Sequence, residues 1–218
     1  MTIMKNRIML LLLALALTSV MNAQSDFEGS ITYKIAYLSL PDELKEMEAM
    51  LPKKVVKYYK GSQVRVEQST AGMGQQIVIT DYDKITGVLL MDFLGNKIAM
   101  AMPAEDLKAA KTLGNDCKAS YKKDTKTIAG YKCKKVLIER DDFPAPVIMY
   151  YTNKWKNKEM EYGSLKGLPL EMTIYKEGIQ MKFSATHVQE ETVENEMFSV
   201  PDGYEIVTAD DLMELFGQ

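Results

Sequence analysis

Apolar and polar residues alternate with a period of two along much of the chain after residue 23, which is the pattern of β-strands with one buried face. The clearest example runs from Gly87 to Met102, where Gly95-Asn96 interrupts two apolar runs in the manner of a two-residue hairpin turn. That turn predicts three facing apolar pairs on one side of the hairpin: Phe93 with Ile98, Met91 with Met100, and Leu89 with Met102. The other side of this hairpin carries a mixture of polar and apolar side chains, some of them small.

A second hairpin shows a sharper contrast between its two faces. With Glu177-Gly178 as the turn, the apolar face carries Ile174 opposite Met181, Met172 opposite Phe183, and Leu170 opposite Ala185. The reverse face carries Thr173 with Lys182 and Glu171 with Ser184. This pattern predicts an antiparallel sheet with one apolar face and one solvated face.

Further strands and three short helices complete the predicted fold. The remaining strand-like segments are residues 27–38, 53–60, 63–69, 75–81, 117–122, 131–139 and 146–152. Helices are expected between Pro41 and Pro52, from Pro103 to Gly114, and after a cap formed by Thr208 and Asp211. We therefore expect a mainly β (α+β) fold: a half-open antiparallel β-barrel or strongly bent sheet of about ten strands. Its short helices cover one face of the sheet or close its open end.

The first 23 residues have the layout of a secretory signal peptide. Lys5 and Arg7 precede an apolar run from Ile8 to Leu17, and Ala23 marks the expected cleavage site. The run is shorter than the roughly 20 residues that a membrane-spanning helix needs, so no transmembrane segment is expected. Residues 24–218 are then expected to form one β domain, in a periplasmic or secreted protein.

Composition and charge exclude several classes of function. One His and two Cys leave too few ligands for a zinc site and only His187 for a catalytic triad. We interpret His187 as a half-buried residue at the rim of its strand. The 27 basic and 30 acidic residues nearly balance, which argues against nucleic-acid binding, and the dispersed lysines are interpreted as a solvated face. No metal, no cofactor and no enzymatic activity are expected.

The two cysteines are a candidate disulfide. If residues 124–126 form a three-residue loop, Cys117 and Cys133 lie opposite each other in a hairpin. A bond closing a loop of this size would contribute about 3 kcal/mol, and an exported protein meets an oxidising compartment. Two reduced buried thiols and a redox role are the alternatives.

An apolar face rich in methionine is the main candidate for a binding site. Methionine is flexible and polarizable, which suits surfaces that adapt to varied apolar ligands. An ordinary hydrophobic core is the alternative. Met47 and Met50 are expected to point inward from a covering helix. The candidate ligand-binding residues are Leu89, Met91, Phe93, Ile98, Met100, Met102, Met172, Ile174, Met181 and Phe183, together with Arg65.

Six short motifs resemble a family of exported Bacteroidota proteins that carry a domain of unknown function. They are Phe27-Glu-Gly29-Ser-Ile31-Thr-Tyr33, Gly61-Ser-Gln-Val-Arg65, Leu90-Met91-Asp92-Phe93, Thr127-Ile-Ala-Gly130-Tyr-Lys-Cys133, Gly167-Leu168-Pro169-Leu170-Glu171 and Phe198-Ser-Val-Pro201-Asp-Gly203-Tyr204. The family is remotely similar to the periplasmic outer-membrane lipoprotein carriers (LolA/LolB-like), which hold acyl chains in an apolar half-barrel. The resemblance matches Arg65 to an arginine that latches the carriers' lid. An exposed strand arginine is the alternative.

Two functions stay open at this point. The first is a non-enzymatic periplasmic binder or carrier of an apolar ligand, an acyl chain or a lipoprotein. The second is an envelope protein-interaction module with a filled core and no ligand. An apolar void above about 300 Å³ would favour the binder.

Overall fold

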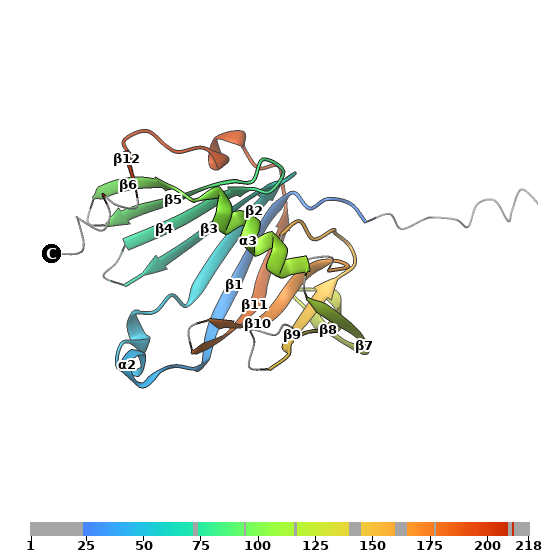
Figure 1. Ribbon diagram of the computed structural model, residues 1–218. Helices are drawn as coiled ribbons and strands as arrows, with labels where there is room; N and C mark the ends of the chain where they lie inside the picture. The colour runs from blue at the N-terminus through green and yellow to red at the C-terminus, as the bar shows by residue number, and fades with distance from the viewer. Residues whose placement is uncertain are drawn as a thin grey trace, which may run out of the picture.

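In the computed structural model, the described residues are 24–71, 74–93, 95–115, 117–139, 145–159, 165–176, 178–208 and 211. They form one strongly bent 12-stranded sheet whose strands follow the order β12-β6-β5-β4-β3-β2-β1-β11-β10-β9-β8-β7 (Figure 1). The strands are β1 (Gly29–Ser39), β2 (Lys54–Lys60), β3 (Gln63–Thr70), β4 (Gly74–Asp81), β5 (Thr86–Phe93), β6 (Asn96–Ala101), β7 (Lys118–Ile128), β8 (Tyr131–Glu139), β9 (Val147–Thr152), β10 (Leu168–Lys176), β11 (Ile179–Glu190) and β12 (Glu205–Val207). The helical segments are α2 (Asp42–Lys45), η1 (Glu48–Met50), α3 (Ala104–Asn115) and η3 (Asn195–Phe198).

The sheet is bent but not closed, as the prediction of a strongly bent sheet requires. Its edge strands are β12 and β7, and every neighbouring pair is antiparallel except β12 with β6. The expectation of about ten strands was too low. The strand β12 was not predicted, because it has three residues and shows no apolar alternation. Only Val207 is buried in it, while Ile206 is 82% exposed.

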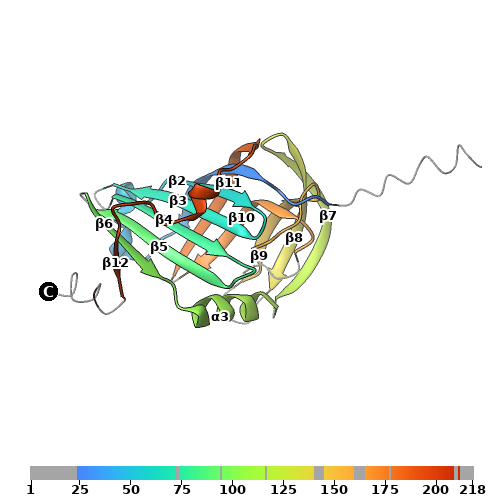
Figure 2. The ribbon, with the colours of Figure 1, turned by 90° about the horizontal axis from the view of Figure 1, so that it is seen from above.

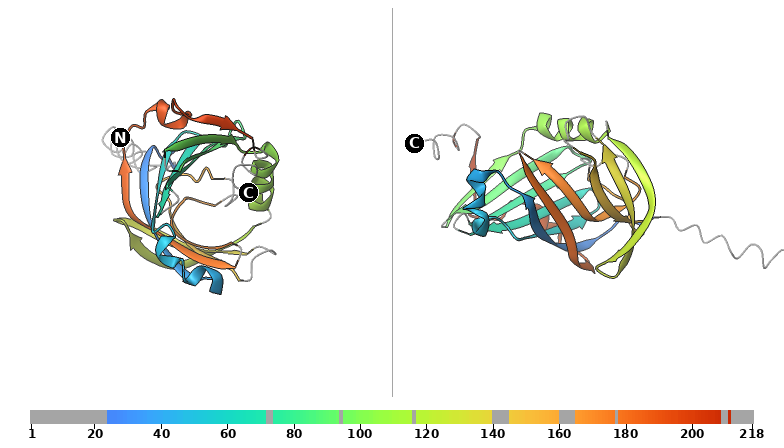
Figure 3. Two further views of the ribbon diagram at one scale, coloured as in Figure 1. Left: turned by 90° about the vertical axis from the view of Figure 1, so that its left-hand side faces the viewer. Right: turned by 90° about the horizontal axis from the view of Figure 1, so that it is seen from below.

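The two faces of the sheet bury different clusters. The side that carries Tyr33, Val55 and Val64, here called the inner face, holds the larger core. The opposite side, here called the outer face, buries Leu90 and neighbouring apolar residues of β4 to β6 under Val193 and Phe198. In the end-on view the strands wrap into an incomplete ring, and the segment containing η3 lies outside it (Figure 3).

The register of the second predicted hairpin is confirmed. Met172 pairs with Phe183 and Ile174 with Met181. The first hairpin has its turn one residue earlier than predicted, because Phe93 pairs with Asn96 and Gly95 takes the positive φ of 88° that the second turn residue needs. The facing pairs are therefore Leu89 with Met100 and Met91 with Ile98. This shift moves the partner by two residues, so every side chain keeps its predicted face.

The predicted disulfide is wrong. The turn between β7 and β8 lies at Ala129 and Gly130, which have φ values of 47° and 86°, and not at residues 124–126. Cys133 consequently pairs with Lys126, whereas Cys117 lies just before Lys118 at the far end of the hairpin. No disulfide joins the two cysteines. Burial raises the pKa of the Cys133 thiol to about 11, which also argues against a reactive thiolate.

The helical cover of the sheet differs from the prediction. The segment after Pro41 breaks into α2 and η1, and Met47 and Met50 are 46% and 39% exposed, so they do not point inward as expected. The predicted second helix is present as α3, and it lies at the opening between β6 and β7 (Figures 2 and 3).

The second and third predicted helices are present in part. Leu107 of α3 is buried, and its Cδ1 lies 3.4 Å from where a Cβ on Gly87 would stand, so α3 packs at the inner face. Thr208 and Asp211 form the predicted cap, since the Thr208 backbone N–H donates to the Asp211 carboxylate over 2.7 Å. The rest of that predicted helix falls outside the described residues. Among the described residues, no helix has the length and apolar character needed to cross a membrane.

Candidate functional site

The Met-rich residues gather on the inner face from two parts of the sheet. Strand register places Val66, Val78, Leu89 and Met100 in one row across β3 to β6. A second row runs from Ile35 through Phe183 and Met172 across β1, β11 and β10. The structure thus brings nine of the predicted ligand-binding residues to one face, here called the Met-rich patch: Leu89, Met91, Ile98, Met100, Met102, Met172, Ile174, Met181 and Phe183. The side chain of Phe93 lies outside the described part.

Most of the Met-rich patch is only half-buried. Met172 and Ile98 are 1% and 8% exposed, but the other seven residues keep intermediate exposure. Elsewhere on the same face, Ile31, Tyr33 and Val136 are fully buried. One part of the inner face is therefore filled by protein, and the patch residues of β10 and β11 belong to that core or pack against it. The seven patch residues of intermediate exposure still keep apolar surface in contact with solvent.

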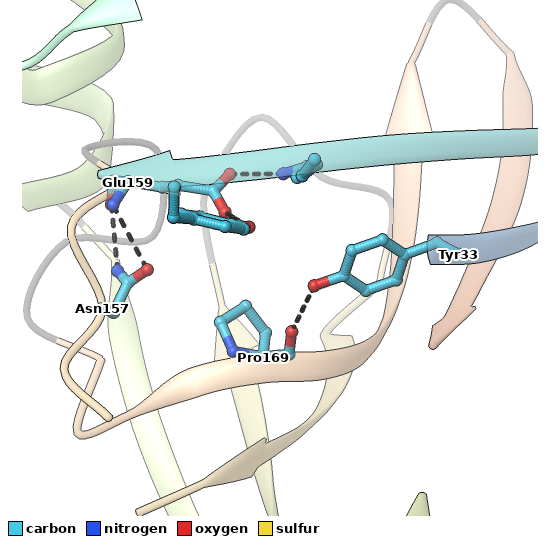
Figure 4. Close-up of polar contacts among 6 residues, drawn as sticks. Tyr33, Asn157, Glu159 and Pro169 are labelled. Carbon is cyan, nitrogen blue, oxygen red and sulfur yellow. Dashed lines mark hydrogen bonds and ion pairs between the residues drawn. The ribbon is translucent and has the colours of Figure 1, made fainter. Parts of the chain in front are cut away.

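A buried polar cluster lies within the filled part of the inner face (Figure 4). The Lys57 ammonium contacts Glu159 Oε2 at 2.5 Å, and the Tyr59 hydroxyl donates to Glu159 Oε1 over 2.8 Å. Asn157 donates to the Glu159 carbonyl and accepts from its N–H, while the Tyr33 hydroxyl donates to the Pro169 carbonyl over 2.9 Å. Glu159 is only 4% exposed, so the segment that carries it is anchored to β2 by charge and hydrogen bonds.

This cluster has the chemistry of a structural anchor. Burial, with the nearby Glu159 carboxylate, raises the pKa of Tyr59 well above its ordinary value, so the phenol stays protonated and donates. Both Glu159 carboxylate oxygens already have partners. No buried side-chain polar atom in the described ranges lacks a hydrogen-bond partner. The same ranges contain no group of acidic, His and Cys residues arranged to hold a metal.

Arg65 lies on the outer face, away from the Met-rich patch. It is 7% exposed, so the interpretation as an exposed strand arginine was wrong. Its Nε donates to Glu67 Oε1 over 2.6 Å and its Nη1 to the Met197 carbonyl over 2.8 Å. Arg65 therefore holds η3 against β3, which covers the apolar residues of the outer face.

Replacing Arg65 should release that segment. We expect Arg65→Met to lower the free energy of unfolding by about 2 kcal/mol, because charge-assisted hydrogen bonds are lost in a buried site. Urea unfolding measures the change, and hydrogen exchange should show faster exchange of the amides of residues 193–198. Arg65→Lys keeps the charge and should cost less. Unchanged exchange in Arg65→Met would contradict this role.

The reverse face of the second hairpin is less solvated than predicted. Glu171 is 8% exposed and accepts from Lys126 over 2.6 Å and from Ser184 over 3.0 Å, with Lys182 at 3.4 Å. Burial alone would raise the pKa of Glu171, but the hydrogen bonds and positive charges of these partners outweigh it, and the pKa is lowered.

A lowered pKa makes the contribution of Glu171 dependent on pH. The ionised carboxylate stabilises the fold at pH values above its ordinary pKa of 4.5, and this stabilisation is lost as the pH falls through the lower folded-state pKa. We expect Glu171→Gln to cost about 1–2 kcal/mol at pH 7 and markedly less at pH 3. Urea unfolding of both proteins at the two pH values measures this, and an equal cost at both would contradict it.

His187 is an exposed residue and not the half-buried rim histidine that the sequence suggested. A β-bulge in β11 lies between the pairs Thr32–His187 and Tyr33–Ala185, so the alternation of faces shifts at this point. The His187 Nδ1 lies 3.1 Å from Thr186 Oγ1.

Three surface grooves lie outside the Met-rich patch. The first, about 1080 Å³, is lined by Gln24, Ser25, Tyr121, Lys122, Lys134, Tyr151, Asn153, Lys154 and Lys166. A second, about 450 Å³, lies beside Met50 and Leu51, and a third, about 420 Å³, beside His187 and Lys34. Sequence reasoning missed the first groove because its residues come from three strands and from segments outside them.

Comparison with known proteins gives a likeness of fold only. No protein-family model and no curated protein matches the chain. Among solved structures, PNGF-II is similar, with 16% identity and a TM-score of 0.50 over 86% of this chain and 32% of PNGF-II. The chain thus spans about a third of the length of PNGF-II.

Two further solved structures have lower scores. The Mycobacterium tuberculosis lipoprotein LppX shows 7% identity and a TM-score of 0.41 over 75% of this chain and 90% of its own. A β-barrel-like protein of domain of unknown function DUF1849 from Brucella abortus shows 10% identity and a TM-score of 0.34 over 78% of this chain and 100% of its own. Scores this low carry no argument about the ligand.

Proposed function

We propose that the protein is a non-enzymatic binder or carrier of an apolar ligand such as an acyl chain, held on the Met-rich patch. The observation that carries the proposal is the half-buried state of seven apolar residues gathered on the inner face of an unclosed sheet. Apolar side chains that stay in contact with solvent on one face of a sheet are a candidate binding surface. Methionine supplies five of the nine patch residues, which suits ligands of varied shape.

The polar clusters support a binder over an enzyme. Lys57, Glu159 and Tyr59 satisfy one another, and the Glu171 carboxylate is likewise occupied by its partners. Neither cluster offers the substrate a group with free hydrogen-bonding capacity, which a general acid or base needs. With the predicted signal peptide, we place this binding function in the periplasm.

A titration with a fluorescent fatty acid tests the proposal. Met100→Glu puts a carboxylate in the Met-rich patch and should weaken saturable binding about tenfold or more, because an acyl chain cannot satisfy a desolvated charge. Met47→Glu is the matched control, since Met47 is 46% exposed outside the patch. Thermal unfolding of both variants separates loss of binding from loss of fold. Absence of saturable binding in the unaltered protein, or equal weakening in both variants, would contradict the proposal.

The filled part of the inner face favours a second candidate, an interaction module for an envelope protein. A packed core there leaves less room for a ligand than an empty barrel does. In that case the protein would bind no fatty acid, and the Met-rich patch would contact a partner's apolar side chains. The same titration distinguishes the two functions.

A further inference from the structure

The groove of about 1080 Å³ lies at the end of the sheet where β7, β8 and β9 meet the start of the described chain. Lys122 of β7 and Lys134 of β8 come from neighbouring strands, and Lys154 and Lys166 come from the segments that flank β9 and β10. Gln24 and Ser25 form another wall. None of the lining residues belongs to the Met-rich patch, so the groove is a separate site.

The charged residues among the described walls of the groove are all positive. Four lysines and no acidic residue line it within the described part of the chain. Lys154 pairs with Glu190 at 2.5 Å, but Lys122 and Lys134 have no ion pair with any described residue. Four ammonium groups around one space repel one another, and an oxyanion placed among them relieves that repulsion. Cleavage after Ala23, which the leader sequence predicts, would add the α-amino group of Gln24 to the same wall.

Aromatic rings and backbone contacts hold these walls in place. Lys154 Nζ lies 4.7 Å from the Trp155 ring, and Lys166 Nζ lies 4.6 Å from the Tyr121 ring. Tyr121 packs edge-on against Tyr151 at 5.7 Å, and its hydroxyl accepts from the Lys166 N–H over 3.2 Å. Ser25 forms a β-bridge with Trp155. A site with fixed walls loses less conformational entropy when a ligand binds.

We propose that this groove binds a ligand that presents at least two oxyanion groups, phosphates, sulfates or carboxylates by chemical class. Lys122 and Lys134 supply two charges that have no ion pair with a described residue, and Lys154 and Lys166 supply two that are positioned by aromatic rings. The volume of about 1080 Å³ exceeds what one inorganic anion fills and suits a small molecule. The site goes beyond the proposed function, since it shares no residue with the Met-rich patch.

Calorimetric titration with tripolyphosphate at about 50 mM salt, where charge screening is weak, tests this site. We expect saturable binding that falls about tenfold or more in the double variant Lys122→Gln, Lys134→Gln, because two charge-assisted contacts are removed. The matched control is Lys118→Gln, Lys135→Gln. It removes the same charge from the same two strands at residues that do not line the groove. Binding in the control should stay within about twofold.

The titration also separates this site from the Met-rich patch and from a general charge effect. Met100→Glu should leave tripolyphosphate binding unchanged. Displacement of tripolyphosphate by phosphatidylglycerol vesicles, but not by phosphatidylcholine vesicles, would identify a lipid headgroup as the source of the oxyanion. No displacement would identify a soluble ligand. No binding by the unaltered protein, or an equal loss in both double variants, would overturn the proposal.

Discussion

Lys57→Met is expected to lower the free energy of unfolding by about 3–5 kcal/mol, because it leaves a buried carboxylate without its cation. The Glu159 side chain is 5% exposed and the Lys57 side chain 12% exposed, so water cannot replace the lost partner. The Tyr59 hydroxyl would be the one remaining donor to that carboxylate among the contacts described. Urea unfolding at pH 7 measures the change.

Two further variants show whether the ion pair is the cause. Lys54→Met makes the same replacement at an exposed position of the same strand and should change stability by less than about 0.5 kcal/mol. The double variant Lys57→Met, Glu159→Gln removes the stranded charge and should recover part of the loss. If Lys57→Met and Lys54→Met have equal costs, the cluster does not anchor the Glu159 segment.

Trp155→Ala is the second variant with a large expected effect, a loss of about 3–5 kcal/mol. Trp155 is 1% exposed, and its ring centroid lies 4.7 Å from that of Phe27 and 4.9 Å from that of Tyr131. Removing the indole leaves a cavity among aromatic residues that cannot fill it. Circular dichroism during urea unfolding is the suitable probe, because Trp155 is the only tryptophan in the chain.

The Trp155 variants also connect the core to the lysine-lined groove. In Trp155→Ala, Lys154 loses the indole ring that lies beneath its ammonium group. The β-bridge between Ser25 and residue 155 also loses the buried indole that fixes it in the core. Tripolyphosphate binding should therefore weaken together with stability. Trp155→Phe keeps an aromatic ring and should cost less on both measurements. A loss of under 1 kcal/mol in Trp155→Ala would show that the aromatic cluster is dispensable.

The sequence predicted the face of the sheet on which each side chain lies better than it predicted the partner of each residue on the neighbouring strand. In the second hairpin, the alternation on both sides of Gly178 predicted the faces and the cross-strand pairs, and the observed pairs agree. In the first, placing the turn one residue late displaced each partner by two, yet Leu89, Met91 and Met100 kept their face. A shift of two residues leaves the face of each side chain unchanged, because side chains alternate with a period of two. A disulfide depends on which residues pair, so the same kind of shift abolishes it. The Cys117 to Cys133 prediction failed because it depended on the exact position of a turn.

The features that the sequence could not predict join residues far apart in the chain. Lys57 and Glu159 are separated by 102 positions, and Arg65 reaches Met197 across 132. Each of these residues looked like an ordinary charge on or near a strand. The lysines of the groove were interpreted as a dispersed solvated face for the same reason. The pairing of β7 with β8 brings Lys122 close to Lys134, and the contact of Lys166 with Tyr121 adds a lysine from a distant segment.

Native mass spectrometry of the protein purified from its own cells tests the central claim most directly, that the Met-rich patch holds an apolar ligand. We expect a bound species with the mass of a fatty acid or lipid. We expect it to be absent from Met100→Glu and present in Met47→Glu. Bare protein in every sample, even after addition of fatty acid, would contradict the claim.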